Sequence, residues 1–98
     1  MLGDWLERHT SQAPPAIRAR VEQYARAASG PTLSRSLAAA GQAALDRVLS
    51  HPGDRSVALD LLAADALITL ALLAQAQTAP ERLEEFATSV LRPPRSDV

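Results

Sequence analysis

The stretch LDLLAADALITLALLAQA, residues 59–76, decides the fold, because it is apolar almost without interruption and yet contains Asp60 and Asp65. Ala and Leu dominate it. Ala has the best helix propensity of all residues, and Leu loses little rotamer freedom in a helix. Asp54 stands shortly before the stretch and is a good N-cap residue. The stretch therefore predicts a long central helix over about residues 54–77.

Pro and Gly residues divide the rest of the chain into segments whose apolar residues follow a helical period. We expect four further helices, over about residues 2–11, 14–30, 33–51 and 79–91. Thr32 is expected to cap the third helix, and Thr78 with Glu81 to form a capping box at the start of the last. Gly41 falls on the apolar face of the third helix, which predicts the close approach of a neighbouring helix.

No segment alternates with a period of two, and few β-branched residues are available for strands, so the predicted fold class is all-α. The 98 residues are enough for one hydrophobic core and too few for two. We expect a single-domain bundle of about five helices over residues 1–91. The tail, residues 92–98, contains a Pro-Pro pair that cannot continue a helix, and we expect it to be disordered.

The central helix is apolar on more than one side when its residues are placed at 100° intervals. A strip of small residues would allow close helix approach, and Asp60 at the head of that strip is expected to face solvent, where the helix dipole favours it. Four short neighbours hardly cover so long a helix, which predicts self-association, most simply as a twofold dimer. The candidate interface residues are Leu59, Leu62, Ala66, Leu70 and Leu73.

Asp65 is the carboxyl group whose surroundings the pattern predicts to be apolar on both sides, and Thr69 follows it one turn later. We expect these two residues to form a polar seam between leucine faces, in contact with an Arg or a backbone group. Buried carboxylates pair with cations in structural networks as well as in active sites, so a structural role is favoured over acid–base catalysis. The alternative is that a small hydrophobic ligand binds in a cavity beside Asp65 and Thr69.

Several kinds of catalytic and metal-binding site are excluded because the residues or motifs that they require are missing. All ten basic residues are Arg, so no lysine is available for a Schiff base or a phosphate loop, and the absence of Cys excludes thiolate chemistry. His9 and His51 do not stand in a zinc-binding spacing, and no nucleophile elbow is present. The sequence therefore predicts no catalytic residues, no cofactor and no metal site.

A net charge of −1 gives no long-range attraction to nucleic acid, so a DNA-binding regulator is the less favoured reading. The N-terminus has an early acidic residue and no apolar run, which is unlike a secretory signal. Two Asp residues in the central helix would each cost about 2.5–3.5 kcal/mol near a bilayer centre, which argues against a membrane span. We expect a cytoplasmic, non-enzymatic protein that works by association, as a homodimer or as an adaptor or regulatory subunit of another protein.

Overall fold

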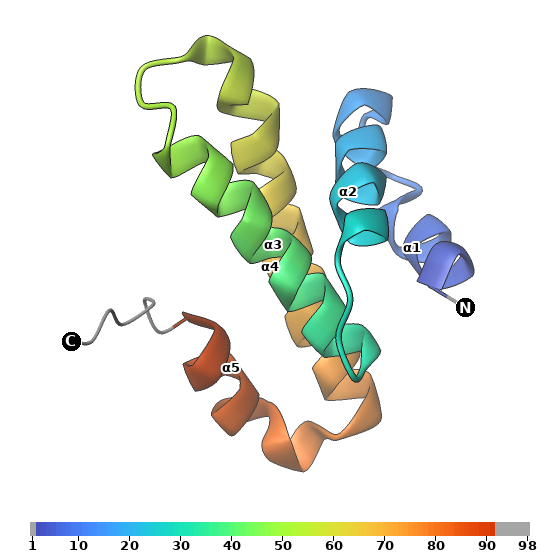
Figure 1. The fold of residues 1–98 in the computed structure, drawn as a ribbon. Helices are drawn as coiled ribbons and strands as arrows, with labels where there is room; N and C mark the ends of the chain where they lie inside the picture. Colours follow the sequence, from blue (N-terminus) through green and yellow to red (C-terminus); the bar gives the residue numbers. More distant parts are fainter. Residues whose placement is uncertain (1, 92–98) are drawn as a thin grey trace, which may run out of the picture.

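A computed structural model describes residues 2–91, and every regular element in this range is helical (Figure 1). The all-α prediction is confirmed. The predicted disordered tail, residues 92–98, lies outside the described residues. In chain order the helices and short 3₁₀ turns are α1 (Leu2–Thr10), α2 (Pro15–Ala27), α3 (Leu33–Leu49), η1 (Arg55–Val57), α4 (Ala58–Thr78), η2 (Pro80–Arg82) and α5 (Leu83–Leu91).

The long helices α3 and α4 form an antiparallel hairpin, and side-chain caps fix where its helices begin. Thr32 Oγ1 accepts a hydrogen bond from the Arg35 amide at 3.1 Å, as predicted for the start of α3. Asp54 Oδ1 accepts one from the Ser56 amide at 2.9 Å and begins the turn η1, which runs directly into α4. Gly53 supplies the positive φ, 81°, that the turn between the two helices requires.

Small side chains let α3 and α4 pack closely. A Cβ added to Gly41 would lie only 2.7 Å from Cδ1 of Ile68, so the predicted close approach at this glycine is confirmed. The strip of small residues on α4 faces α3 and is buried, as the close-approach argument requires. The buried alanines of the two helices are Ala38, Ala40 and Ala44 on α3, and Ala63, Ala64, Ala71 and Ala74 on α4.

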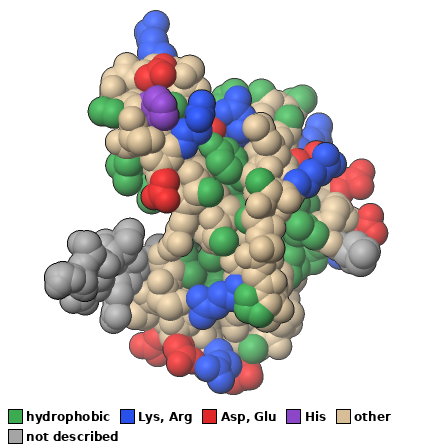
Figure 2. Space-filling model, viewed as in Figure 1, with side chains coloured by type: hydrophobic (Ala, Val, Ile, Leu, Met, Phe, Trp, Pro, Cys, Tyr) green, Lys and Arg blue, Asp and Glu red, His purple; other side chains and the backbone are tan. Residues whose placement is uncertain are grey.

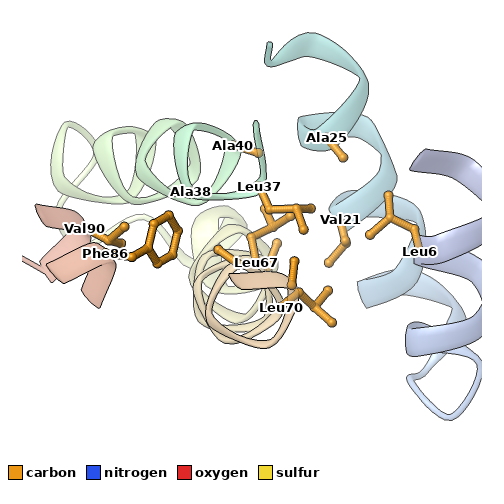
Figure 3. Close-up of a cluster of buried hydrophobic side chains, with 13 residues drawn as sticks. Leu6, Val21, Ala25, Leu37, Ala38, Ala40, Leu67, Leu70, Phe86 and Val90 are labelled. Carbon is orange, nitrogen blue, oxygen red and sulfur yellow. The ribbon is translucent and has the colours of Figure 1, made fainter. Parts of the chain in front are cut away.

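The remaining helices cover opposite sides of the hairpin: α2, with α1 beyond it, lies on one side and α5 on the other (Figure 1). Leu37 and Leu67 are fully buried at the centre of the core. Figure 3 shows Val21 and Leu6 reaching this centre from the α2 side, and Phe86 on the opposite side. The hairpin is thus the scaffold on which the shorter helices pack.

The predicted capping box at the start of the last helix is wrong. Thr78 is the last residue of α4, and its hydroxyl donates a 2.9 Å hydrogen bond to the Ala74 carbonyl inside that helix. Pro80 begins the next turn instead, because its fixed φ suits a first helical turn and it has no amide hydrogen to satisfy.

Candidate functional site

Large hydrophobic side chains remain exposed on the hairpin, although a single core would be expected to bury most of them. Within residues 2–91, all of the exposed large hydrophobic residues belong to α3 or α4. Figure 2 shows hydrophobic side chains at the surface of this part of the molecule. The residues and their exposed fractions are Leu45 40 %, Leu49 68 %, Leu61 51 %, Leu62 48 % and Leu73 38 %.

Three of these leucines line an apolar groove of about 510 Å³ between α3 and α4. The groove lies in the half of the hairpin nearer its turn. Val90, near the end of α5, marks its other end. Its lining residues are Gly41, Gln42, Leu45, Asp46 and Leu49 from α3, Leu61, Ala64, Asp65 and Ile68 from α4, and Val90 from α5.

The same seam between α3 and α4 is covered by α5 beyond the groove. Phe86 and Val90 of α5 are 2 % and 7 % exposed, and both point toward the hairpin core (Figure 3). Arg35 lies over the Phe86 ring, 4.7 Å from its centroid, and its Nη1 donates to Ser89 Oγ at 2.9 Å. Gln42 Nε2 donates to the Val90 carbonyl at 3.1 Å, which fastens the end of α5 to α3. Within residues 2–91, the covered and bare parts of the seam therefore meet at Val90.

The charged residues of the groove have one sign. Asp46 and Asp65 line it from the two helices, both are exposed, and no basic residue is among the described residues that line it. Within residues 2–91 neither carboxylate takes part in an ion pair. The groove is therefore apolar along its floor and acidic at its edges.

The predicted interface residues on α4 divide between core and surface. Leu70 is 7 % exposed and belongs to the core cluster of the chain itself. Leu62 and Leu73 are exposed, on the side of α4 away from the groove, while Leu59 and Ala66 are half-buried. These four residues form what we call the outer leucine face of α4, and its role in self-association stays a prediction.

The predicted seam residues Asp65 and Thr69 are both exposed. Their positions on the helix place them between the groove side of α4 and the outer leucine face, so apolar surface lies on either side of them. Within residues 2–91, Asp65 has no arginine partner at ion-pair distance. A polar seam in the assembled protein stays a prediction.

Asp60 is not solvent-facing, and that expectation was wrong. The residue is 1 % exposed, and its side chain joins three helices. Oδ1 accepts hydrogen bonds from Arg20 Nη1 at 2.7 Å and from the Tyr24 hydroxyl at 2.6 Å, both on α2. Oδ2 lies 3.6 Å from Nε of Arg47 on α3. Its position at the head of the small-residue strip, the face that packs on α3, was the sequence signal for burial.

The surroundings of Asp60 keep it ionised. Burial alone raises the pKa of this carboxyl, but the hydrogen bonds from Tyr24 and Arg20 and the charges of Arg20 and Arg47 outweigh burial and hold the pKa below its usual value. Burial, and then the hydrogen bond to Asp60, raise the pKa of Tyr24. The carboxylate thus has its partners supplied by the protein, which suits a structural link between helices better than proton transfer.

No family model, no curated protein and no solved structure matches this chain. The features of this molecule that bear on its function are therefore the groove and the outer leucine face. In the described part of the chain, no three His, Cys, Asp or Glu side chains gather where they could hold a metal ion. His9 stacks on Trp5 with ring centroids 4.1 Å apart, and its Nδ1 lies 2.8 Å from the Trp5 carbonyl oxygen.

The segment Arg55–Thr78 is long and apolar enough to cross a membrane, by length and composition only. Nearly half of its most apolar window, 44 %, is buried inside the chain. The core helix of a bundle has the same composition, because it packs against neighbours on several sides. This segment is therefore weak evidence for a membrane span.

Proposed function

We propose that this protein is a non-enzymatic association module, which works by receiving an apolar surface of a protein partner in the groove between α3 and α4. The observation that carries the proposal is the exposure of Leu45, Leu49 and Leu61 along one apolar groove. Contiguous exposed apolar surface on a small domain is typical of interaction sites, because burying it on a partner releases its hydration cost.

Both a homodimer and an adaptor that binds another protein are compatible with this function. The hairpin offers two apolar surfaces, the groove and the outer leucine face, which lie on different sides of α4. A twofold dimer through the outer leucine face would leave the groove free for a partner. The module could in that way present two grooves from one assembly.

Leu61 and Leu62 provide a matched pair of positions for the test. They are neighbours in α4 with nearly equal exposure, 51 % and 48 %, but they point about 100° apart, so only Leu61 lines the groove. Leu61→Arg is expected to abolish binding of a groove partner without unfolding the domain. Leu62→Arg, which adds the same charge and removes the same apolar area, is expected to retain that binding.

The measurement is proximity labelling in the source cells, with quantitative comparison of the proteins recovered by the wild type and by the two variants. A partner recovered by the wild type and by Leu62→Arg but not by Leu61→Arg supports the proposal. Recovery that is identical for all three proteins contradicts it. Sedimentation of the purified proteins in parallel determines the oligomeric state, and a dimer lost only with Leu62→Arg identifies the outer leucine face as the dimer contact.

The groove also favours a second candidate function, the binding of a small hydrophobic ligand. Its volume, about 510 Å³, falls within the range of ordinary ligand pockets, and Asp65 stands at its edge. A thermal-shift screen against lipids and hydrophobic metabolites tests this function. A ligand that stabilises the wild type and Leu62→Arg but not Leu61→Arg would favour it over protein association.

A further inference from the structure

The helix α5 shows what kind of element packs on the seam between α3 and α4. Where the seam is covered, the covering element is a helix, α5, with Phe86 and Val90 buried against the hairpin (Figure 3). These residues are four apart and therefore lie on one side of their helix. The bare part of the seam, the groove, has a similar floor of Leu, Ile and Ala side chains. An amphipathic helix is thus the element that suits the rest of the seam.

The charges beside the two parts of the seam differ. Beside the covered part Arg35 lies over Phe86, and Glu85 of α5 pairs with Arg82 of η2 at 2.9 Å, so both signs are present there. Beside the bare part stand Asp46 and Asp65, with no basic residue among the described residues that line it. Opposite charges at the edge of an interface favour the matching partner, and like charges disfavour the wrong one. A helix that occupies the groove should therefore have basic residues beside Asp46 and Asp65.

We propose that the groove binds a basic amphipathic helix of a different protein, which lies along the seam with Arg or Lys residues beside Asp46 and Asp65. The proposal depends on the association function above and names the chemistry of its partner. Apolar side chains of the helix, at spacings of three and four residues, would contact Leu45, Leu49 and Leu61. This is the helix-in-groove mode of recognition, in which apolar anchors provide affinity and the charged edges provide specificity.

A second copy of this chain is a poorer occupant. Among the described helices, α2 has three arginines, but its apolar residues Val21 and Ala25 are buried in the core and are not available to another molecule. The helix α5 is acidic in its first turn. Two grooves placed face to face would bring Asp46 and Asp65 of one copy against the same carboxylates of the other, and these like charges would repel.

The test is a display selection of helical peptides. In the library the apolar anchor positions vary among Leu, Ile, Phe and Met, and the flanking positions vary among Lys, Arg, Glu and Ser. The target is the full-length protein. We expect the selected peptides to have Lys or Arg at the flanking positions. A matched peptide with Glu at those positions should bind about three- to tenfold more weakly, since exposed ion pairs contribute modestly, and the difference should shrink as salt rises.

Charge reversal on the protein makes the test reciprocal. Asp65→Arg should reverse the preference, so that the Glu peptide binds more tightly than the Lys peptide. The matched control is Glu84→Arg, an equal change of net charge at an exposed position of α5 that is not among the residues lining the groove. It should leave the preference for the basic peptide unchanged. Because Asp65 is exposed, its replacement should not alter folding, which circular dichroism verifies.

The outcomes separate this inference from the function on which it depends. Selected peptides with no charge preference, or with an acidic one, overturn the inference, while loss of their binding in Leu61→Arg would still support groove association. A homodimer that occludes the groove also overturns the inference alone. The same holds if the display selection yields no binding peptide while proximity labelling recovers a partner that is lost with Leu61→Arg. Binding that survives Leu61→Arg contradicts both proposals.

Discussion

The Tyr24 hydroxyl donates a 2.6 Å hydrogen bond to Oδ1 of Asp60, which links α2 to the first turn of α4. Arg20 donates to the same oxygen, and Arg47 brings α3 into the same cluster. Ser34 Oγ of α3 also donates to Gln75 Oε1 of α4 at 2.9 Å, but within residues 2–91 no other side-chain hydrogen bond joins α2 to the hairpin. The rest of the contact between α2 and the hairpin is apolar, and apolar contacts allow sliding and rotation more readily than directional hydrogen bonds do. The cluster therefore fixes the orientation of α2 on the hairpin that bears the groove.

Replacing Asp60 by Ala should lower the free energy of unfolding by about 2–4 kcal/mol, because it leaves the Tyr24 hydroxyl and two arginines without their partner. The partial exposure of Arg20, whose side chain is 30 % exposed, lets water replace part of the loss and keeps the effect below the largest values for buried pairs. Urea denaturation measures it. Tyr24→Phe, which removes one hydrogen bond, should cost less, and an equal or larger loss for Tyr24→Phe would contradict this order.

The Asp60 cluster also predicts a pH dependence. The folded state holds the pKa of this carboxyl below its usual value of 3.8, so the ionised form is favoured by folding. The stabilisation is fully present above about pH 4 and is lost as the pH falls through the lower, folded pKa. The stability difference between the wild type and Asp60→Asn should therefore shrink on acidification below about pH 4. A difference that grows on acidification would show that the carboxylate is not stabilised by its partners.

The sequence predicted the helices well, because Pro and Gly interrupt a chain that otherwise favours helix throughout. Residue type and position were enough to predict the capping roles of Thr32 and Asp54 and the close helix approach at Gly41. Asp60 was misread because its charge suggested solvent, whereas its place in the small-residue strip indicated burial. Its partners Arg20 and Tyr24 lie 40 and 36 residues away in the chain, a distance across which periodicity gives no information.

The groove contains Asp65, beside which a cavity was the alternative prediction from the sequence, but not Thr69. Its position and extent were not predicted, because it exists only where α5 stops short of covering the hairpin. The sequence indicated surplus apolar surface on more than one side of the central helix. The groove, however, also depends on Leu45 and Leu49 of α3, and the helical pattern of α3 did not indicate that these leucines would be exposed. Which apolar side of a helix stays bare is a property of tertiary packing, and the helical period alone does not contain it.

Alanine substitutions at Leu67 and Leu62 test how α4 is oriented in the core. Leu67 is fully buried and Leu62 is 48 % exposed, although both stand in the same apolar run. Leu67→Ala should cost about 2–5 kcal/mol of unfolding free energy, through lost apolar burial and the cavity left behind. Leu62→Ala should cost well under half as much, since it removes a side chain already in contact with water. Thermal and urea denaturation of the two variants measure the difference, and similar losses would mean that α4 is rotated from its described position.

Substitutions at Gly41 and Ile68 test the close contact between α3 and α4. A Cβ at Gly41 would lie 2.7 Å from Cδ1 and 3.0 Å from Cγ1 of Ile68, so a branched side chain there has no room unless Ile68 moves. Gly41→Val should lower the free energy of unfolding by about 1–3 kcal/mol through overpacking, despite the better helix propensity of Val.

The second substitution of this pair is Ile68→Ala, which removes the atoms that the new side chain would meet. In the double variant, Gly41→Val should cost less than it does in the wild-type background, because the valine fills space vacated by the isoleucine. Denaturation of the wild type, both single variants and the double variant gives the coupling energy. Strictly additive losses would place the two residues out of contact, and would remove the close approach of α3 and α4 on which the floor of the groove depends.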